Sequence, residues 1–222
     1  MERTPESEAI AAIEQAEQFN DHMKKSLVQH EYRKLAKRLV SMSVPAGGQV
    51  LDVGTGPGYI AMEIAVLLRD QVCVTGFDLS KAMLTIAERN AGERGLEPFI
   101  KWQEGDAKSM PFEDNSFDAL ATSGSLHHWD NPLLVFNEIA RVLKPQGIAL
   151  IRDSRRLQKR SARLFAGMIG LSIPSDFRVH YWNSIRASYT PAELESMLRQ
   201  SNLKNWTIEQ DIMDLMVVVG KK

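Results

Sequence analysis

Short apolar runs and longer amphipathic segments follow one another along the chain. Apolar runs bounded by glycine, proline or polar residues predict strands, and apolar residues three or four positions apart predict helices. The expected strands span residues 50–53, 72–77, 99–103, 117–122, 148–152, 205–209 and 215–219. The expected helices span residues 7–20, 26–42, 59–68, 81–91, 132–143, 157–170 and 191–201.

This order of elements predicts an α/β fold. From residue 50 onward strands and helices alternate, which favours a doubly wound, mostly parallel sheet with helices on both faces. We expect the last two strands to form an antiparallel pair. The helix at 191–201 has the clearest start, because Thr190, Pro191 and Glu193 provide an N-cap, a first-turn proline and a capping-box acid.

The most informative segment is the turn after the first strand, which contains Asp52, Gly54, Thr55, Gly56 and Gly58. Glycines in such a turn let the backbone adopt positive φ and approach a ligand closely. A dinucleotide places its pyrophosphate at the helix N-terminus, where an acid before the first glycine offers nothing useful. S-adenosylmethionine has an ammonium and a sulfonium but no phosphate, so an adjacent acid suits it. The turn therefore favours this methyl donor over a dinucleotide.

Polar residues also follow the next strands at the points where they end. Asp78 ends the second strand and can accept hydrogen bonds from both ribose hydroxyls of a nucleoside. Asp106 follows the third strand and can accept an adenine amino group, and Ser123 follows the fourth. The carboxyl ends of parallel strands share one edge of the sheet, so we expect one ligand site there.

With these residues in order, the chain resembles the class I S-adenosylmethionine-dependent methyltransferases, and within them the ubiquinone and menaquinone biosynthesis-like group (methyltransferase type 11). The resemblance is strong over residues 49–153 and is carried by residues 52–58, Asp78, Asp106 with Ala107, residues 126–128 and residues 141–147. It implies a Rossmann-like seven-stranded sheet with an antiparallel last strand. It also implies S-adenosylmethionine as donor and S-adenosylhomocysteine as product.

The resemblance also suggests roles for other residues. Ser123 is expected near the methionine end of the donor, and Leu79 and Met83 beside its adenosine. We expect a single domain made of an N-terminal helical cap (1–46), a donor-binding core (47–153), a substrate-side helix and lid (154–190) and a C-terminal helix and strand pair (191–222).

Methyl transfer is an in-line displacement, so the enzyme must chiefly align acceptor, methyl group and sulfur. A general base is needed only if the nucleophile starts protonated, as a phenol, enol or alcohol does. His127 and His128 are the first candidates because they follow the fourth strand. The alternative is a structural role, in which the pair cages the donor or packs the loop.

Two segments are expected to form the acceptor side. The aromatic and polar segment 173–189 resembles a lid, and His180, Tyr181 and Tyr189 are its candidate acceptor contacts. On the other side, the N-terminal helices place four residues where related enzymes have a mobile cap. These are Phe19, His22, His30 and Tyr32.

A basic stretch runs from Arg155 to Arg163. Residues 155, 156, 159, 160 and 163 would fall on one helical face, and a solvated cationic face is the favoured interpretation. The alternatives are an anion-attracting rim for a phosphorylated or carboxylated acceptor, a contact with a membrane surface, or an RNA-binding face. The net charge of −1 speaks against nucleic acid as partner.

Composition bears on the cellular compartment, on a membrane span and on metal binding. The single cysteine, Cys73, lies in an apolar strand, permits no internal disulfide and suits a reducing cytosol. An acidic N-terminus without an apolar core, and no long apolar run, favour a cytoplasmic protein without a membrane span. Metal binding is not expected, because the five histidines lack ligand spacing and neighbouring histidines should point apart.

Three functional classes and one question of assembly stay open. The leading class is a methyltransferase acting on a small molecule, with an RNA methyltransferase as the alternative acceptor choice. A non-catalytic donor-binding protein would have the same donor residues. A dinucleotide-dependent oxidoreductase is disfavoured by Asp52 and by Tyr59, which stands where that fingerprint has its third glycine. A homodimer is compatible with the sequence.

Overall fold

The computed structural model describes residues 2–6, 12–171, 173 and 175–220. Its helices are α1 (Ile13–Met23), α2 (Ser26–Ser41), α3 (Tyr59–Leu68), α4 (Lys81–Glu93), α5 (Pro132–Val142), α6 (Arg160–Leu171), α7 (Ser175–Ala187) and α8 (Pro191–Gln200). Its strands are β1 (Gly48–Val53), β2 (Val72–Asp78), β3 (Ile100–Glu104), β4 (Phe117–Ser123), β5 (Leu143–Ser154), β6 (Trp206–Gln210) and β7 (Asp214–Val219). Short 3-10 turns are η1 (Arg69–Gln71), η2 (Glu97–Phe99) and η3 (Leu126–His128).

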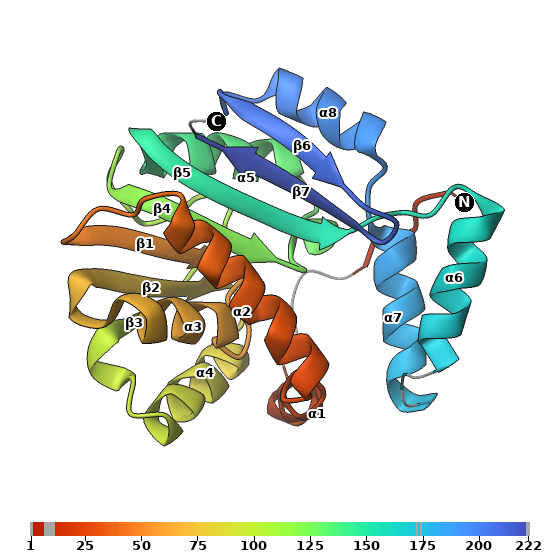
Figure 1. The fold of residues 1–222 in the computed structure, drawn as a ribbon, viewed down its shortest axis with the longest axis horizontal. Coiled ribbons are helices and arrows are strands. Elements are labelled where there is room, and N and C mark those ends of the chain that lie inside the picture. Colours follow the sequence, from red (N-terminus) through yellow and green to blue (C-terminus); the bar gives the residue numbers. More distant parts are fainter. Residues whose placement is uncertain (1, 7–11, 172, 174, 221–222) are drawn as a thin grey trace.

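The seven strands form one sheet in the order β3-β2-β1-β4-β5-β7-β6 (Figure 1). β1 to β5 are parallel, and β7 is antiparallel to both β5 and β6. The predicted α/β sheet and its antiparallel end are therefore confirmed. The strand order reverses between β1 and β4, and in open α/β sheets such a point is where ligands bind.

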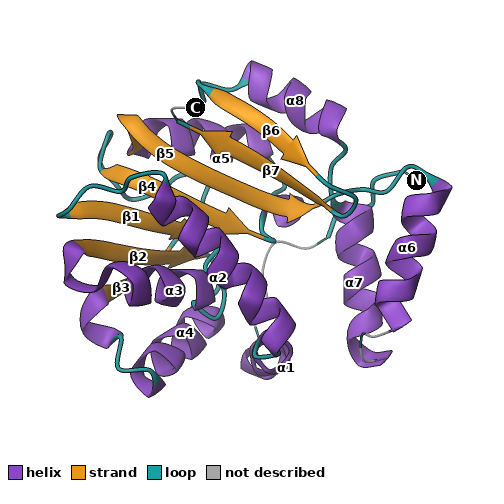
Figure 2. Ribbon diagram, in the orientation of Figure 1, coloured by secondary structure: helices purple, strands orange, loops and turns teal. Residues whose placement is uncertain are grey.

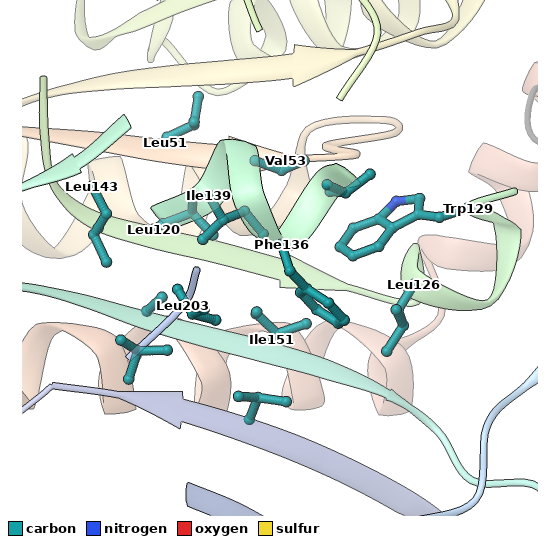
Figure 3. Packing of buried hydrophobic residues seen from close by; sticks show 14 of the residues in the cluster. Leu51, Val53, Leu120, Leu126, Trp129, Phe136, Ile139, Leu143, Ile151 and Leu203 are labelled. Carbon is teal, nitrogen blue, oxygen red and sulfur yellow. The ribbon is translucent and has the colours of Figure 1, made fainter. Parts of the chain in front are cut away.

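Helices cover both faces of this sheet (Figure 2). On one face, Leu39 of α2 and Ile64 of α3 pack with Val50 and Leu150 of the strands. On the other, α5 and α8 pack against alternate strand residues, and Phe136 of α5 is fully buried there (Figure 3). Residues next to each other in the strands thus serve opposite layers, as the alternation of a pleated strand requires.

Several element bounds differ from those expected. β5 begins at Leu143, because the segment 143–147 continues the strand instead of ending a helix. The segment expected as an insert forms helix α7, and α6 begins at Arg160. α1 begins at Ile13; residues 7–11 of the helix expected at 7–20, and Pro174 of the expected lid, lie outside the described residues.

The predicted start of α8 is confirmed. Thr190 accepts a hydrogen bond from the Glu193 amide (3.3 Å), and the Glu193 carboxylate accepts one from the Thr190 amide (2.8 Å). This is the predicted capping box of α8. Cys73 lies on β2 as expected but is half-buried. None of the helices in the described part of the chain is long and apolar enough to span a membrane.

Candidate donor and acceptor site

A cavity of about 730 Å³ opens at the carboxyl ends of β1, β2 and β4. This is the edge at which the strand order reverses, and the volume falls in the usual range for small-molecule sites. Its wall on the sheet side is the glycine turn and the ends of β2, β3 and β4. The opposite wall comes from α1, α2, α7 and the N-terminal residue Glu6.

The backbone conformation of the turn at residues 54–58 explains its glycines. Gly54, Gly56 and Gly58 have φ of 65°, 52° and 84°, a region that residues with a Cβ rarely adopt. The amides of Gly54 and Thr55 donate to the Phe77 carbonyl at 2.8 and 3.0 Å, which ties the turn to β2. A Cβ at Gly54 would lie 2.2 Å from the Ser125 hydroxyl oxygen, so only glycine fits there.

Asp78 lies where the turn meets the end of β2 and faces the cavity. Its two carboxylate oxygens accept hydrogen bonds from the amides of Gly56 (2.7 Å) and Ser80 (2.8 Å). Burial raises the pKa of this carboxyl, while the backbone amides oppose the shift. Each oxygen retains a second acceptor site, so ribose hydroxyls can be added to the bonds already present.

Asp52 has a different position from the one expected. It is fully buried and is not among the residues of the cavity wall. One oxygen accepts hydrogen bonds from the Thr55 hydroxyl (2.6 Å) and the Ala61 amide (3.1 Å), and the other has no partner among the described residues. Burial raises its pKa to about 7. The contacts that the structure gives Asp52 support the glycine turn and the first turn of α3 from beneath.

The remaining predicted donor residues, apart from Gly58, all line the cavity. These residues are Gly54, Thr55, Gly56, Leu79, Met83, Asp106, Ala107 and Ser123. Asp106 accepts a hydrogen bond from the Lys108 amide (2.8 Å) and is otherwise partly exposed. Gly58 lies behind the wall, where a Cβ would come within 2.7 Å of the Trp102 ring.

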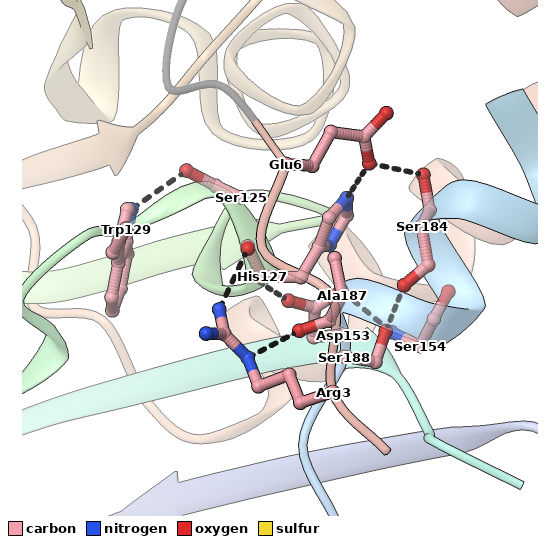
Figure 4. Close-up of polar contacts among 10 residues, drawn as sticks. All are labelled: Arg3, Glu6, Ser125, His127, Trp129, Asp153, Ser154, Ser184, Ala187 and Ser188. Atoms are coloured by element: carbon pink, nitrogen blue, oxygen red, sulfur yellow. Dashed lines mark hydrogen bonds and ion pairs between the residues drawn. The ribbon is translucent and has the colours of Figure 1, made fainter. Parts of the chain in front are cut away.

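His127 is the most closely held polar side chain at the cavity (Figure 4). It is 4% exposed, and its ring Nδ1 lies 2.7 Å from Asp153 Oδ1. The other carboxylate oxygen accepts from the His127 amide at 2.6 Å, and Oδ1 also accepts from the Ser154 amide at 2.7 Å. The ring Nε2 makes no hydrogen bond among the described residues.

Charges around the His127 ring oppose the effect of burial on its pKa. Burial favours the neutral ring, but the Asp153 carboxylate and, more weakly, Glu6 hold the pKa of His127 above its usual value. Glu6 Oε2 lies 3.8 Å from His127 Nε2. The ring is thus fixed in orientation by the Asp153 carboxylate, and the Glu6 carboxylate faces its other nitrogen.

Residues 3–6 form a strap that joins this ring to α7. The Arg3 guanidinium donates to the carbonyls of Ala187 (2.7 Å) and His127 (3.2 Å), and the Thr4 amide donates to the Arg186 carbonyl (3.2 Å). The Ser184 hydroxyl donates to Glu6 at 3.3 Å. The Arg3 guanidinium carbon also lies over the Tyr189 ring, 4.2 Å from the ring centroid.

The acceptor side of the cavity contains most of the residues expected there. His128, His180 and Tyr181 line it, whereas Tyr189 is buried beneath the strap and is not on the wall. Of the expected cap residues, Phe19, His22 and Tyr32 line the cavity and His30 does not. His22 stacks on Phe177 of α7 with ring centroids 4.0 Å apart, so the cap and α7 meet over the cavity.

The expectation that His127 and His128 point apart is wrong. Their ring centroids are 4.1 Å apart, because the 3-10 turn η3 does not alternate side chains as a strand does. Candidate ligand atoms of Glu6, His127 and His128 lie within 4.8 Å of one another. At the His127 ring the Asp153 and Glu6 carboxylates outweigh the opposing Arg3 guanidinium, so the charges around this group do not argue against a cation.

The predicted basic face is also wrong. Arg155 and Arg156 precede α6 and cannot share a helical face with Arg160 and Arg163. Arg155 donates to the Asp211 carbonyl (2.8 Å). Arg156 is 5% exposed and pairs with Glu193 of α8. Two of the five cations therefore stabilise the fold.

Two residues of the site were missed in the sequence. The first is Asp153: a carboxylate at the end of β5, beside β4, can reach the turn that follows β4. That register was the available signal. Glu6 had no such signal, because its place depends on the contacts of the strap with α7.

Comparisons with known proteins agree with this geometry. A family model described as a methyltransferase domain matches residues 51–151. The uncharacterized methyltransferase YcgJ of Bacillus subtilis is 36% identical over 105 residues, which cover 47% of this chain and 40% of that protein. Demethylmenaquinone methyltransferase of Bacillus licheniformis is 29% identical over 179 residues, 76% of each chain.

The fold has solved counterparts. A putative S-adenosyl-L-methionine-dependent methyltransferase from Methanococcus maripaludis superposes with a TM-score of 0.75 over 98% of this chain and 97% of that one, at 23% identity. The first curated relatives are matched over less than half of their own length.

Proposed function

The chain belongs to the class I S-adenosylmethionine-dependent methyltransferases, and we propose that it transfers the methyl group of this donor to a small-molecule acceptor. The observation that carries the proposal is the His127–Asp153 pair. Asp153 fixes the ring, and His127 is among the residues that line the same cavity as the glycine turn. Donor residues and a candidate base thus face the same space.

The residues at the sheet edge fit the donor. The positive-φ glycines at 54 and 56 leave backbone exposed to the cavity, and Asp78 offers carboxylate oxygens where a ribose would lie. Leu79, Met83 and Asp106 also line the cavity and would form the side that holds the adenosine. When bound, S-adenosylmethionine supplies an electrophilic methyl group on a sulfonium and leaves as S-adenosylhomocysteine.

We propose that His127 removes the proton of the acceptor. As the nucleophile forms its bond to the methyl carbon, the acceptor proton passes to Nε2 and the ring becomes an imidazolium. Asp153 stabilises that cation through Nδ1 at 2.7 Å and keeps the ring from turning. Glu6, 3.8 Å from Nε2, adds to the stabilisation of the same charge.

The wall of the acceptor side indicates its chemical class. Aromatic rings of Phe19, Tyr32, Phe177 and Tyr181 line it. Apart from histidines, Lys108 is the one cationic side chain among the described wall residues, and it is paired with Asp130 at 2.9 Å. We therefore propose an uncharged, partly aromatic acceptor with a hydroxyl or an acidic C–H, rather than a phosphorylated or carboxylated one. The named relative from Bacillus licheniformis is a demethylmenaquinone methyltransferase, which agrees with this class.

RNA is a weaker choice of acceptor. The basic stretch is divided among the Arg156–Glu193 pair, the Arg155–Asp211 hydrogen bond and the start of α6, and no arginine is among the described residues of the cavity wall. Activity on RNA would require a continuous cationic path from the surface to the site.

The proposal is tested in two steps. Calorimetric titration with S-adenosylmethionine and S-adenosylhomocysteine should give micromolar binding, with NAD as the non-binding control. Release of S-adenosylhomocysteine is then screened over phenols, hydroquinones and alcohols, comparing the wild type with His127→Gln. We expect about 100-fold or greater loss of activity in the variant with unchanged donor binding. Donor binding without transfer to any acceptor would favour a non-catalytic donor-binding protein.

A further inference from the structure

Helix α6 has its large apolar side chains on the outside. Leu164 is 71% exposed, Met168 56%, Leu171 74% and Phe165 39%. On a helix these four positions fall on one side, about 120° wide. An apolar face of this extent is unusual for a solvated surface and marks an interaction site.

The inner side of α6 is built from small residues. Ala166 and Gly170 are buried, with Ala162 packed against the same cluster. The Tyr181 hydroxyl of α7 donates to the Ala166 carbonyl at 3.2 Å, and a Cβ at Gly170 would be in ordinary contact with the Tyr181 ring. The small residues therefore bring α6 close to α7, and the outward position of the large ones is a consequence of this packing.

Cations lie at the start of this face. Lys159 and Arg160 are exposed and Arg163 is half-buried, and none of the ion pairs among the described residues includes any of the three. The sequence has no aspartate or glutamate between residues 154 and 175. Such a face combines apolar side chains with unpaired cations and has no acidic residues beside it. It is therefore complementary to a lipid surface, which has an apolar interior and, where its lipids are anionic, a negatively charged boundary.

We propose that the outward face of α6 docks on a membrane surface containing anionic lipids. Leu164, Phe165, Met168 and Leu171 would enter the boundary between headgroups and acyl chains. Lys159, Arg160 and Arg163 would contact lipid phosphates. A second copy of the chain is less suited to this face, because it would bring a cation-rich, acid-free segment against itself.

The place of α6 in the fold adds a second argument. In Figure 1, α7 lies between α6 and the rest of the protein. The residues of α7 that line the cavity include Phe177, His180 and Tyr181. A protein docked through α6 would therefore hold its acceptor side near the lipid boundary, where an amphiphilic acceptor is dissolved. This link to the acceptor rests on the proposed methyl transfer, whereas docking itself does not.

The experiment is co-sedimentation of the full chain with vesicles of phosphatidylcholine alone, or of equal parts phosphatidylcholine and phosphatidylglycerol. We expect binding to the anionic vesicles that weakens with salt. The charge variant Lys159→Gln/Arg160→Gln should lower the partition coefficient about fivefold for each cation removed. The apolar variant Leu164→Gln/Met168→Gln should lower it at least about tenfold.

Matched control variants test whether vesicle binding depends on the outward face of α6 or on exposed cations and apolar side chains in general. Lys37→Gln/Lys101→Gln removes two exposed cations elsewhere, and Val66→Gln/Leu134→Gln removes two apolar side chains that are each 45% exposed on α3 and α5. Both should bind vesicles as the wild type does. Titration with S-adenosylhomocysteine reports the donor site in every variant, so a misfolded variant is recognised and the failure of docking is distinguished from failure of the proposed function.

Two results would overturn the proposal. The first is absence of binding to the anionic vesicles by wild-type protein that binds S-adenosylhomocysteine. The second is a dimer in sedimentation velocity that Leu164→Gln/Met168→Gln dissociates, which would make this face a contact between copies of the chain.

Discussion

Replacing Asp153 by asparagine changes the charge beside His127 with almost no change in shape. The carboxylate accepts three hydrogen bonds, from the ring Nδ1 and from the amides of His127 and Ser154, at 2.6–2.7 Å. An asparagine has one acceptor oxygen and one amide nitrogen that can only donate. Asp153→Asn must therefore either turn an amide group against a backbone N–H or release the ring.

The structure allows the size of the effect to be worked out. A hydrogen bond to a charged group contributes about 1.5–3 kcal/mol, and here it strengthens as the ring becomes an imidazolium. Losing it should lower kcat about 10- to 150-fold. The KM for the acceptor should change little, because Asp153 is not among the residues of the cavity wall.

The pH dependence provides a second, independent sign. The base acts as the neutral ring, so activity rises with pH through the pKa of His127, which Asp153 holds above its usual value. Without the carboxylate, burial lowers that pKa, and the rise in activity should move to lower pH. NMR titration of the His127 ring measures the same shift without an acceptor.

Asp118→Asn is the matched control. Asp118 also accepts from a backbone amide, that of Gln49 at 2.9 Å, and pairs with Lys144 at 2.7 Å, but it is not on the cavity wall. It should leave the His127 titration and kcat unchanged. An unaltered His127 pKa in Asp153→Asn, with full activity, would refute the role given to the pair.

Three further predictions concern the donor side. Asp78→Ala should weaken binding of S-adenosylhomocysteine at least about tenfold in calorimetry, because the ribose hydroxyls lose charged acceptors; unchanged affinity would contradict the assignment. Gly54→Ala should lower the free energy of unfolding by about 3 kcal/mol in urea titration, since its Cβ would meet Ser125 at 2.2 Å, whereas Gly56→Ala, with open space, should lose only about 1–2 kcal/mol. Asp52 has a folded-state pKa of about 7, above its unfolded value of 3.8, so its contribution to stability is complete below pH 4 and declines up to pH 7. Relative to Asp52→Asn, the wild type should therefore lose about 4 kcal/mol of unfolding free energy between these pH values, and parallel curves for the two proteins would refute the shift.

The sequence was sufficient for the sheet because its strands are local apolar runs with clear ends. The bounds of β5 were missed, since Pro145 and Gly147 look like a helix stop although the strand begins at Leu143. The donor residues were predictable for a related reason. Asp78 and Asp106 end or follow strands, and in a parallel sheet strand ends share one edge.

The acceptor side depends on contacts that no local pattern contains. Glu6 reaches His127 only because the strap is bonded to the last turn of α7, far along the chain. Tyr189 has the residue type of a pocket contact, yet Arg3 stacks on it and places it behind the wall. Asp52 was assigned to the donor by its position in the motif, while its burial follows from the packing of α3 on β1.

The strap has a consequence for how molecules enter the acceptor side. It is held by three hydrogen bonds from Arg3 and Thr4, by the Ser184–Glu6 hydrogen bond and by the Arg3–Tyr189 contact, which together contribute about 4–5 kcal/mol. At that cost it would be released roughly 0.1% of the time or less. The strap therefore covers the His127 side of the cavity, and hydrogen exchange at the Thr4 amide should show protection that a bound acceptor increases.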